Sequence, residues 1–267
     1  MTIPPLSTTD LAHGKVAWRG AGQAAPLVLL HGLGGSSRSW ECQYRTLGDT
    51  FRVVAWDCPG YGASDDLADP TPGVDDYVTA ALGLIDALGF ETVALLGHSM
   101  GGVVAGRLAS RHPARVSHLV LSCTSVGWGG PRHAARAAGF EKRLSELRTL
   151  TAAEFGAARA ATMVADDCDP TVRAKVAGIA SEARLSGYGA ACHMLMNTDN
   201  SEVIRSLALP TMVISADQDR VASAAQADEL VHMIEGCQHV ILRGVGHAPY
   251  IEDPETYNAT LRRFLAS

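Results

Sequence analysis

A serine between two glycines is the residue of this 267-residue chain best suited to nucleophilic chemistry. Ser99 lies in the segment G-H-S-M-G at 97–101, directly after an apolar run of strand length at 92–96 and before apolar positions at helical spacing. A serine on a sharp strand-to-helix turn has strained backbone angles, and glycines two positions away on either side remove side chains that would clash. Because the bare motif also occurs in ordinary glycine-rich connections, the strand before it and the helix after it carry the interpretation. The helix N-terminus below Ser99 would stabilise an anionic intermediate.

A second glycine-rich turn, H-G-L-G-G at 31–35, follows the apolar run 25–30. The patterns G-x-x-x-x-G-K-[ST] and G-x-G-x-x-G, which cradle phosphates, are absent from it. A tight turn without bulky side chains lets backbone N–H groups point at a developing negative charge, so we interpret the turn as an oxyanion hole with Leu33 as a donor. A plain tight turn is the alternative.

An acid and a histidine near the end of the chain can complete a hydrogen-bond chain to the serine. Asp217 and Asp219 follow one apolar run, and His247 follows the last one, whereas no acid follows the run 116–121. The C-terminal ends of parallel strands meet at one edge of a sheet, so side chains far apart in the sequence can meet there. His239 competes with His247, but it lies at the start of its strand, at the opposite edge.

Six apolar runs alternate with helical patterns, which predicts an α/β fold with a doubly wound, mostly parallel sheet. The segment from Lys15 to Arg19 is one more candidate strand. An alanine- and arginine-rich insertion of helical pattern interrupts the alternation, which divides the chain into a core domain of residues 1–125 and 206–267 and a helical cap of residues 126–205. The six runs are 25–30, 51–56, 92–96, 116–121, 210–215 and 238–242.

The composition argues against several classes of partner. The formal net charge is -6 and no run of Lys or Arg occurs, so neither nucleic acid nor an anionic membrane is expected. No apolar run approaches the roughly 20 residues of a membrane span, and the N-terminal segment lacks the basic and apolar parts of an export signal, so we expect a cytoplasmic protein. Six cysteines without a C-x-x-C pair suggest small buried thiols in a reducing compartment. Neither a metal nor a cofactor is indicated.

Taken together, these motifs resemble the α/β-hydrolase superfamily, in its serine-nucleophile branch with a helical cap. The resemblance covers the whole chain and includes D-x-P-G-x-G-x-S at 57–64 and G-x-G-H-A-P at 244–249. It implies that Ser99 is the nucleophile, His247 the general base and Asp219 the orienting acid, with the N–H groups of Leu33 and Met100 as the oxyanion hole. Ala216 stands where the family usually has glycine, which leaves Asp217 as a second candidate acid.

Within this superfamily the chain is most similar to enzymes of the 3-oxoadipate enol-lactonase type and to their relatives, the meta-cleavage product hydrolases of aromatic compound catabolism. The resemblance implies cleavage of a small carboxylic ester or enol-lactone by water through an acyl-enzyme. Alternatives are carbon-carbon bond hydrolysis, amide hydrolysis, cofactor-free perhydrolysis and a non-catalytic ligand receptor. The carbon-carbon hydrolases typically show asparagine and tryptophan where His98 and Ala248 stand. Serine at the elbow argues against the dehalogenases and epoxide hydrolases, which use aspartate there.

The cap of such enzymes sets substrate choice, so polarisable and polar residues of the insertion are candidates for the pocket wall. Ordinary cap packing is the alternative for each of them. Arg184 and His193 could meet a substrate carboxylate, or they could simply be solvated. A homo-oligomer is left open. The candidate substrate-binding residues are Trp128, Met163, Arg184, Tyr188, His193, Met194 and Met196.

Overall fold

The sheet at the centre of the molecule has eight strands in the order β1-β2-β4-β3-β5-β6-β7-β8. The computed structural model describes residues 3–130 and 134–266. Strands β4 to β8 and β3 pair in parallel, while β1 and β2 are antiparallel, so the predicted doubly wound, mostly parallel sheet is confirmed. The strands are β1 (Ser7–Leu11), β2 (Gly14–Ala21), β3 (Ala25–Leu30), β4 (Phe51–Trp56), β5 (Val93–His98), β6 (Val116–Ser122), β7 (Thr211–Ala216) and β8 (Gln238–Leu242).

The apolar runs form strands because both faces of the sheet are covered. In β3, Val28 and Leu30 pack into one core cluster while Leu27 and Leu29 pack into the other, as the two-residue period of a strand requires. Strand β1 was not predicted, because its sequence S-T-T-D-L is polar and alternates between half-buried and exposed positions. Such an edge strand has no continuous apolar run to reveal it.

Helices cover the two faces of this sheet in separate groups. Helices α2, α3 and α9 contribute to the first core cluster, and α1 and α11 contribute to the second. No helix of the described residues is long and apolar enough to cross a bilayer. The helices are η1 (Ser37–Trp40), α1 (Glu41–Leu47), α2 (Val74–Ala87), α3 (Met100–Arg111), η2 (Pro113–Arg115), α4 (Ala134–Thr149), α5 (Ala152–Met163), α6 (Pro170–Ala180), α7 (Leu185–Asn197), α8 (Ser201–Ile204), α9 (Ala224–Met233), α10 (Pro249–Glu252) and α11 (Pro254–Leu265).

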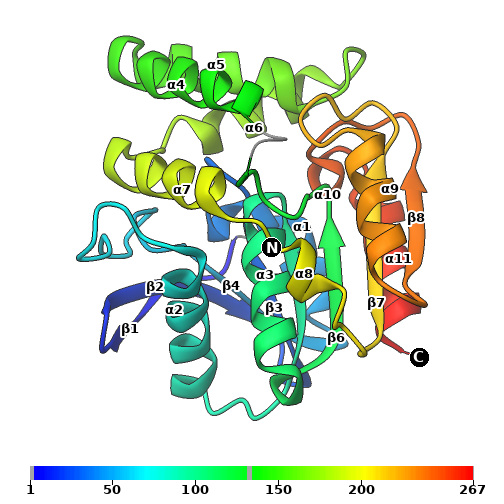
Figure 1. Cartoon of the computed structure of the whole chain (residues 1–267). Helices are drawn as coiled ribbons and strands as arrows, with labels where there is room; N and C mark the ends of the chain where they lie inside the picture. Colours follow the sequence, from blue (N-terminus) through cyan, green and yellow to red (C-terminus); the bar gives the residue numbers. More distant parts are fainter. Residues whose placement is uncertain (1–2, 131–133, 267) are drawn as a thin grey trace.

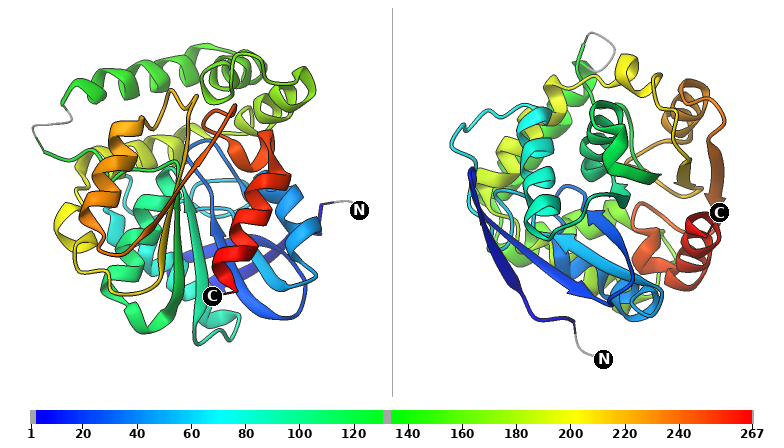
Figure 2. Two further views of the ribbon diagram at one scale, coloured as in Figure 1. Left: turned by 90° about the vertical axis from the view of Figure 1, so that its right-hand side faces the viewer. Right: turned by 90° about the horizontal axis from the view of Figure 1, so that it is seen from below.

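Helices α4 to α7 lie together beyond the C-terminal ends of the strands (Figures 1 and 2). The chain enters and leaves this layer through two segments that run side by side. The N–H of Trp128 donates to the carbonyl of Leu195 at 2.9 Å, that of Gly129 donates to Thr198 at 2.7 Å, and that of Asn200 donates to Val126 at 2.8 Å. Backbone hydrogen bonds therefore join the segment that enters the helical layer to the segment that leaves it.

Helix α7 touches the core at a point where two backbones meet. A Cβ atom on Gly187 would lie 2.0 Å from the carbonyl oxygen of Gly60, so neither position has room for a side chain. Beside this contact the guanidinium of Arg184 donates to the carbonyls of Gly60 and Ser64 and to the carboxylate of Asp66, at 3.0, 2.7 and 2.8 Å. These contacts fix the start of α7 to the loop after β4.

Candidate active site

Ser99 lies on a strained turn between strand β5 and helix α3. Its φ and ψ angles are 52° and -117°, a conformation that residues other than glycine rarely adopt. The flanking glycines are sterically required, because a Cβ on Gly97 would lie 2.2 Å from the carbonyl oxygen of Gly101, and one on Gly101 would lie 2.2 Å from that of Leu30. The turn therefore directs the Ser99 hydroxyl out of the end of the sheet.

Three side chains from separate loops form one hydrogen-bond chain. Ser99 Oγ lies 3.0 Å from His247 Nε2, and His247 Nδ1 lies 2.8 Å from Asp219 Oδ2. The other carboxylate oxygen of Asp219 accepts from the N–H groups of Val221 and Ala222 at 2.7 and 2.9 Å. The side chains of His247 and Asp219 are only 3% and 1% exposed, so the hydrogen bond between them is shielded from water.

Asp219 is held in its ionised form. Burial alone would raise its pKa, but the adjacent His247 and the backbone N–H donors outweigh burial, and the pKa lies below its ordinary value. An ionised Asp219 requires the proton of the imidazole to sit on Nδ1, which leaves Nε2 as an acceptor for the serine hydroxyl.

The competing acid and histidine point elsewhere. Asp217 accepts from the N–H of Gly244 at 2.8 Å and lies 3.7 Å from the guanidinium of Arg243. The ring of His239 lies 2.9 Å from the hydroxyl of Ser215, one strand away. Only Asp219, of the two candidate acids, contacts the histidine that reaches Ser99.

Two backbone N–H groups beside Ser99 are placed to receive a negative charge. The turn at Gly32 runs against the serine, since a Cβ on Gly32 would lie 3.0 Å from Ser99 Cβ. The Met100 N–H is the first of helix α3, where no carbonyl precedes it within the helix. Within the described part of the chain, the Leu33 N–H donates to no carbonyl or side chain. Both predicted oxyanion donors are thus available.

His98 is a buried contact of His247 that the sequence analysis did not assign to the site. Its Nε2–H donates to the backbone carbonyl of His247 at 2.7 Å, and its ring packs against those of His247 and Tyr250. Burial, reinforced by His247, lowers the pKa of His98 to about 3, so the ring is neutral. The sequence signal was its place directly before Ser99.

The corner between helices α5 and α6 is joined to the loops that carry His247 and Asp219. The N–H of His247 donates to the carbonyl of Met163, and the carboxylate of Glu252 accepts from the N–H groups of Gly246, Ala248 and Ala165.

The same corner between α5 and α6 also contacts the loop that carries Asp219. The guanidinium of Arg220, next to Asp219, donates to the carbonyls of Ala161 and Val164 and to the carboxylate of Asp166. The acid, the base and this corner form one connected unit.

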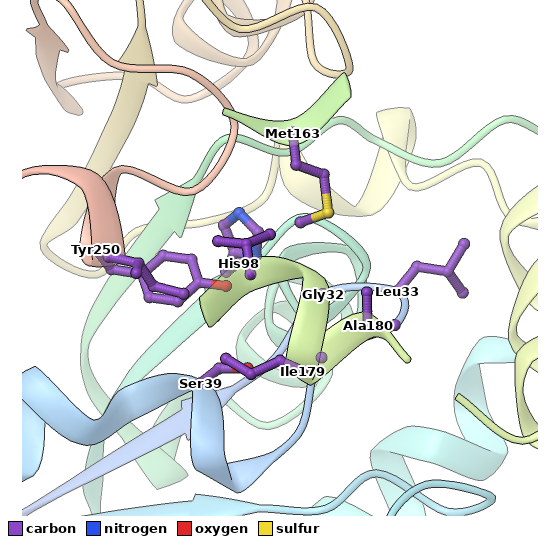
Figure 3. Close-up of a pocket in the computed structure, with 12 residues that line it drawn as sticks. Gly32, Leu33, Ser39, His98, Met163, Ile179, Ala180 and Tyr250 are labelled. Carbon is purple, nitrogen blue, oxygen red and sulfur yellow. The ribbon is translucent and has the colours of Figure 1, made fainter. Parts of the chain in front are cut away.

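Two small cavities of about 10 Å³ each flank Ser99. Such a volume holds about one water molecule, so side chains must move to admit a substrate. The first cavity is shown in Figure 3, where the side chain of Met163, at the end of helix α5, points toward His98 and the ring of Tyr250 lies alongside. The second contains Ser99 itself. Its lining is Ser99, Met100, Val103, Cys123, Thr124, Ser125, Trp128, Leu195, Val221, Ala222 and Gln226.

The candidate pocket residues of the cap are distributed differently from the expectation. Met163 and Trp128 line the two cavities beside Ser99. Tyr188 is fully buried and its ring edge faces Gly34 of the oxyanion turn, at 3.7 Å from a Cβ built there. The structure therefore brings three of the candidates to the site or its border.

Four candidates lie elsewhere. His193 and Met194 line an outer cavity beside the start of helix α2, and Met196 packs against the main core. The guanidinium of Arg184 is already bonded to two carbonyls and Asp66, so the expectation that it meets a substrate carboxylate is corrected. His193 lines this outer cavity, and its contact with a substrate carboxylate stays a prediction.

Cys123 is the residue of the site most able to ligate a soft metal ion. Its Sγ, a carboxylate oxygen of Asp219 and a ring nitrogen of His247 lie within 4.8 Å of one another. A metal there would compete for the atoms that join Asp219 to His247. Burial raises the pKa of the Cys123 thiol well above its ordinary value, which disfavours the thiolate that binds metals. All six cysteines are free, and three are buried while three are half-buried, so the expectation of buried thiols holds only in part.

Comparisons with known proteins agree with this fold. The model of the alpha/beta hydrolase family matches residues 27–260. The protein RutD of Escherichia coli O157:H7 (strain EC4115), provisionally named a carbamate hydrolase, is 29% identical over 255 residues, which are 91% of this chain and 92% of RutD.

Two solved structures also superimpose closely on this chain. The enol-lactonase of Burkholderia xenovorans LB400 superimposes with a TM-score of 0.89 at 26% identity, covering 98% of this chain and all (100%) of that one. A hydrolase of Pseudomonas aeruginosa PA01 gives 0.87 at 26% identity, with 98% of each chain covered.

The fold and the site define a hydrolytic enzyme built on a doubly wound sheet. The chain belongs to the alpha/beta hydrolase family, and it resembles the members of enol-lactonase type. Its reactants are accordingly a small molecule and water.

Proposed function

We propose that the protein is a serine hydrolase that cleaves a small carboxylic ester or lactone through a covalent acyl-enzyme. The observation that carries this proposal is the buried chain from Ser99 Oγ to His247 Nε2, at 3.0 Å, and from His247 Nδ1 to Asp219 Oδ2, at 2.8 Å. A serine hydroxyl is a weak nucleophile unless an oriented base accepts its proton. The geometry supplies such a base.

In the proposed reaction His247 removes the Ser99 proton as the oxygen attacks the substrate carbonyl. The tetrahedral oxyanion accepts hydrogen bonds from the N–H groups of Leu33 and Met100. When it collapses, the bond to the leaving oxygen breaks and His247 returns the proton to that oxygen, releasing an alcohol or opening a lactone. Water then attacks the acyl-enzyme with His247 as base, which frees the carboxylic acid and regenerates Ser99.

Within this proposal, residues 126–205 act as the cap and determine access to Ser99. Support comes from Met163 and Trp128, which belong to this segment and line the cavities at the serine. The apolar lining, interrupted by few polar groups, suits a small and partly apolar carbonyl compound.

The likeness to the enol-lactonase supports an ester or lactone substrate, and with it a role in the breakdown of aromatic compounds. His98 and Ala248 occupy the places of the asparagine and tryptophan typical of carbon-carbon hydrolases, which disfavours that reaction. A carbamate is the second candidate substrate, favoured by the similarity to RutD along nine-tenths of the chain. Its cleavage breaks a carbon-nitrogen bond and requires His247 to protonate an amine.

A substrate panel tests the proposal. Purified enzyme is assayed with short p-nitrophenyl esters, enol-lactones, simple amides, carbamates, a vinylogous diketone and a peracid-forming mixture. We expect the highest kcat/KM among the esters or lactones, and a burst of p-nitrophenol equal to the enzyme concentration if deacylation is slow. Faster carbamate or diketone turnover would reassign the reaction. Ligand binding without any turnover would indicate a receptor.

A further inference from the structure

An arginine of helix α4 contacts three residues that line the cavity containing Ser99. Arg136, on helix α4, donates to the carbonyl of Val221 at 3.2 Å and to Oε1 of Gln226 at 2.8 Å, and its guanidinium lies 5.1 Å from the centre of the Trp128 ring. Val221, Gln226 and Trp128 all line the same cavity as Ser99. Arg136 is therefore at the border of the reaction site, although α4 begins far from it in sequence.

The position of Arg136 is fixed before any ligand binds. Gln226 Oε1, its acceptor, also accepts from the N–H of Ser223 at the start of helix α9, at 3.0 Å. The guanidinium also lies over the Trp128 ring, within cation–π distance, and this contact favours the same position. A guanidinium has five N–H donors, so two hydrogen bonds leave others for a ligand.

The charge of Arg136 has no carboxylate partner among the described residues, because both of its acceptors are neutral. By contrast, Arg184 and Arg220 on the same side of the molecule each pair with an aspartate. Burial and then Arg143 lower the pKa of Arg136, whereas the more distant carboxylate of Asp219 raises it, so its positive charge is poorly solvated and only partly balanced. A half-buried charge without a directly paired carboxylate is costly, and an anion bound beside it would relieve that cost.

Two further arginines add to the positive potential. Arg143 follows on the same helix, with its guanidinium 5.4 Å from the Phe140 ring, and Arg159 of helix α5 is only 7% exposed. No carboxylate of the described residues lies within 4.0 Å of either, and Glu146, the nearby acid, pairs with Lys142 at 3.7 Å. Helices α4 and α5 thus carry three arginines without an ion pair among the described residues, while the chain as a whole has a net charge of -6.

We infer that Arg136 forms an anion subsite of the Ser99 cavity and that the ester or lactone cleaved there carries a free carboxylate. The inference rests on the proposed function and specifies its substrate class. A guanidinium binds a carboxylate through two parallel N–H bonds, which orients the substrate as well as attracting it. The sequence analysis considered Arg184 and His193 for this contact, and we now assign it to Arg136.

The test compares two esters that differ only in charge. Wild-type enzyme and Arg136→Gln are assayed with the monomethyl ester of a short dicarboxylic acid and with its neutral dimethyl ester, over a series of chain lengths. We expect Arg136→Gln to raise KM for the half-ester by about 10- to 100-fold, with kcat unchanged, and to alter neither constant for the diester more than about twofold. Arg136→Lys, which keeps the charge, should recover part of the loss.

Arg184→Gln is the matched control, because it removes the same charge from the cap at a place outside the cavity. It should leave the ratio of the two KM values unchanged. The inference is overturned if Arg136→Gln changes both esters equally or neither of them. It is also overturned if Arg184→Gln reproduces the effect, since net charge alone would then explain it.

A binding measurement separates this inference from the proposed function. If wild-type enzyme hydrolyses neither ester, the proposed function fails, and titration calorimetry with the free dicarboxylate still tests the subsite. Binding that weakens at least 10-fold in Arg136→Gln and not in Arg184→Gln would support the subsite without any turnover. No binding to the wild type, or equal binding to the Arg136→Gln variant, would overturn it.

Discussion

The backbone N–H of His247 donates to the carbonyl oxygen of Met163, and the two atoms lie 2.6 Å apart. His247 is the proposed base, and Met163 is the last residue of helix α5. A shift of the α5–α6 corner would therefore move the imidazole relative to Ser99. Since displacements of about 1 Å at a reacting group can cost about 100-fold in rate, cap mutations at this corner should alter chemistry as well as binding.

Replacing the proposed nucleophile is the first test. Ser99→Ala should lower kcat by about 10⁴-fold or more, because Ser99 provides the only hydroxyl bonded to His247 Nε2 among the residues that the structure describes. Circular dichroism and the melting temperature should stay close to those of wild type, since the change removes one oxygen atom. An acyl-enzyme or full turnover in this variant, detected by mass spectrometry and by ester assay, would exclude Ser99 as the nucleophile.

The two aspartates after β7 should behave differently. Asp219→Asn removes the charge that holds the Nδ1 proton of His247 and should reduce kcat by about 10⁴-fold. Asp217→Asn disturbs the hydrogen bond from Gly244 and the ion pair with Arg243, neither of which involves His247, and it should cost less than about 10-fold. Steady-state ester kinetics of both variants decide the matter, and the opposite ranking would make Asp217 the orienting acid.

Gly246 is expected to be intolerant of any side chain. A Cβ there would lie 2.7 Å from the carbonyl carbon of Val164 and 2.8 Å from the oxygen of Met163, so the cap corner must shift. Gly246→Ala should lower the free energy of unfolding by roughly 1–3 kcal/mol and reduce kcat.

Gly178→Ala is the control for this prediction. Gly178 is an exposed position of helix α6, and a Cβ there meets no atom within 4 Å. Alanine should stabilise that helix by up to about 1 kcal/mol and leave kcat unchanged. Urea unfolding and ester kinetics of the pair give the answer, and equal behaviour of the two variants would contradict the steric argument.

The buried ring of His98 should make folding sensitive to acid. Because its pKa falls from 6.5 in the unfolded chain to about 3 in the folded protein, the unfolded state binds the extra proton first. The stability contributed by the neutral ring is present above pH 6.5 and is lost as the pH falls toward 3. Between pH 7 and 5 the loss amounts to about 2 kcal/mol.

His98→Asn isolates this contribution, since asparagine does not titrate and its amide can still donate toward His247. The free energy of unfolding of wild type should fall by about 2 kcal/mol more than that of the variant between pH 7 and 5, while other titrating groups cancel. Parallel pH profiles of the two proteins, measured by urea unfolding, would show that His98 is already accessible to protons.

The sequence predicted the parts of the fold that depend on local pattern. Apolar runs revealed the buried parallel strands, and the residues at their C-terminal ends revealed Ser99, Asp219 and His247 as neighbours. Strand β1 was not predicted, because a strand at an exposed edge needs no apolar run. The hydrogen-bond partners Glu252 and Arg220 escaped because their contacts join segments about 50 to 90 residues apart that only the folded chain brings together.

The cap was the least predictable region, and the reason is geometric. Apolar spacing shows that a helix such as α7 has a buried face, yet it does not show which neighbour covers that face. His193 and Met194 consequently face an outer cavity, while Leu195, the next residue, lines the cavity of Ser99. Arg136 gave no signal, since a charged residue near a helix start ordinarily faces solvent.

The backbone contact between Gly60 and Gly187 limits how this enzyme can be redesigned. Exchanging helices between relatives is an obvious way to change the substrate, but a donor segment with any other residue at 187 would collide with the loop after β4. A chimaera must therefore keep glycine at both positions, or the exchanged segment must end before α7 begins. The variable portion available to an engineer is then helix α4, because the end of α5 at Met163 is bonded to His247 and must keep its place.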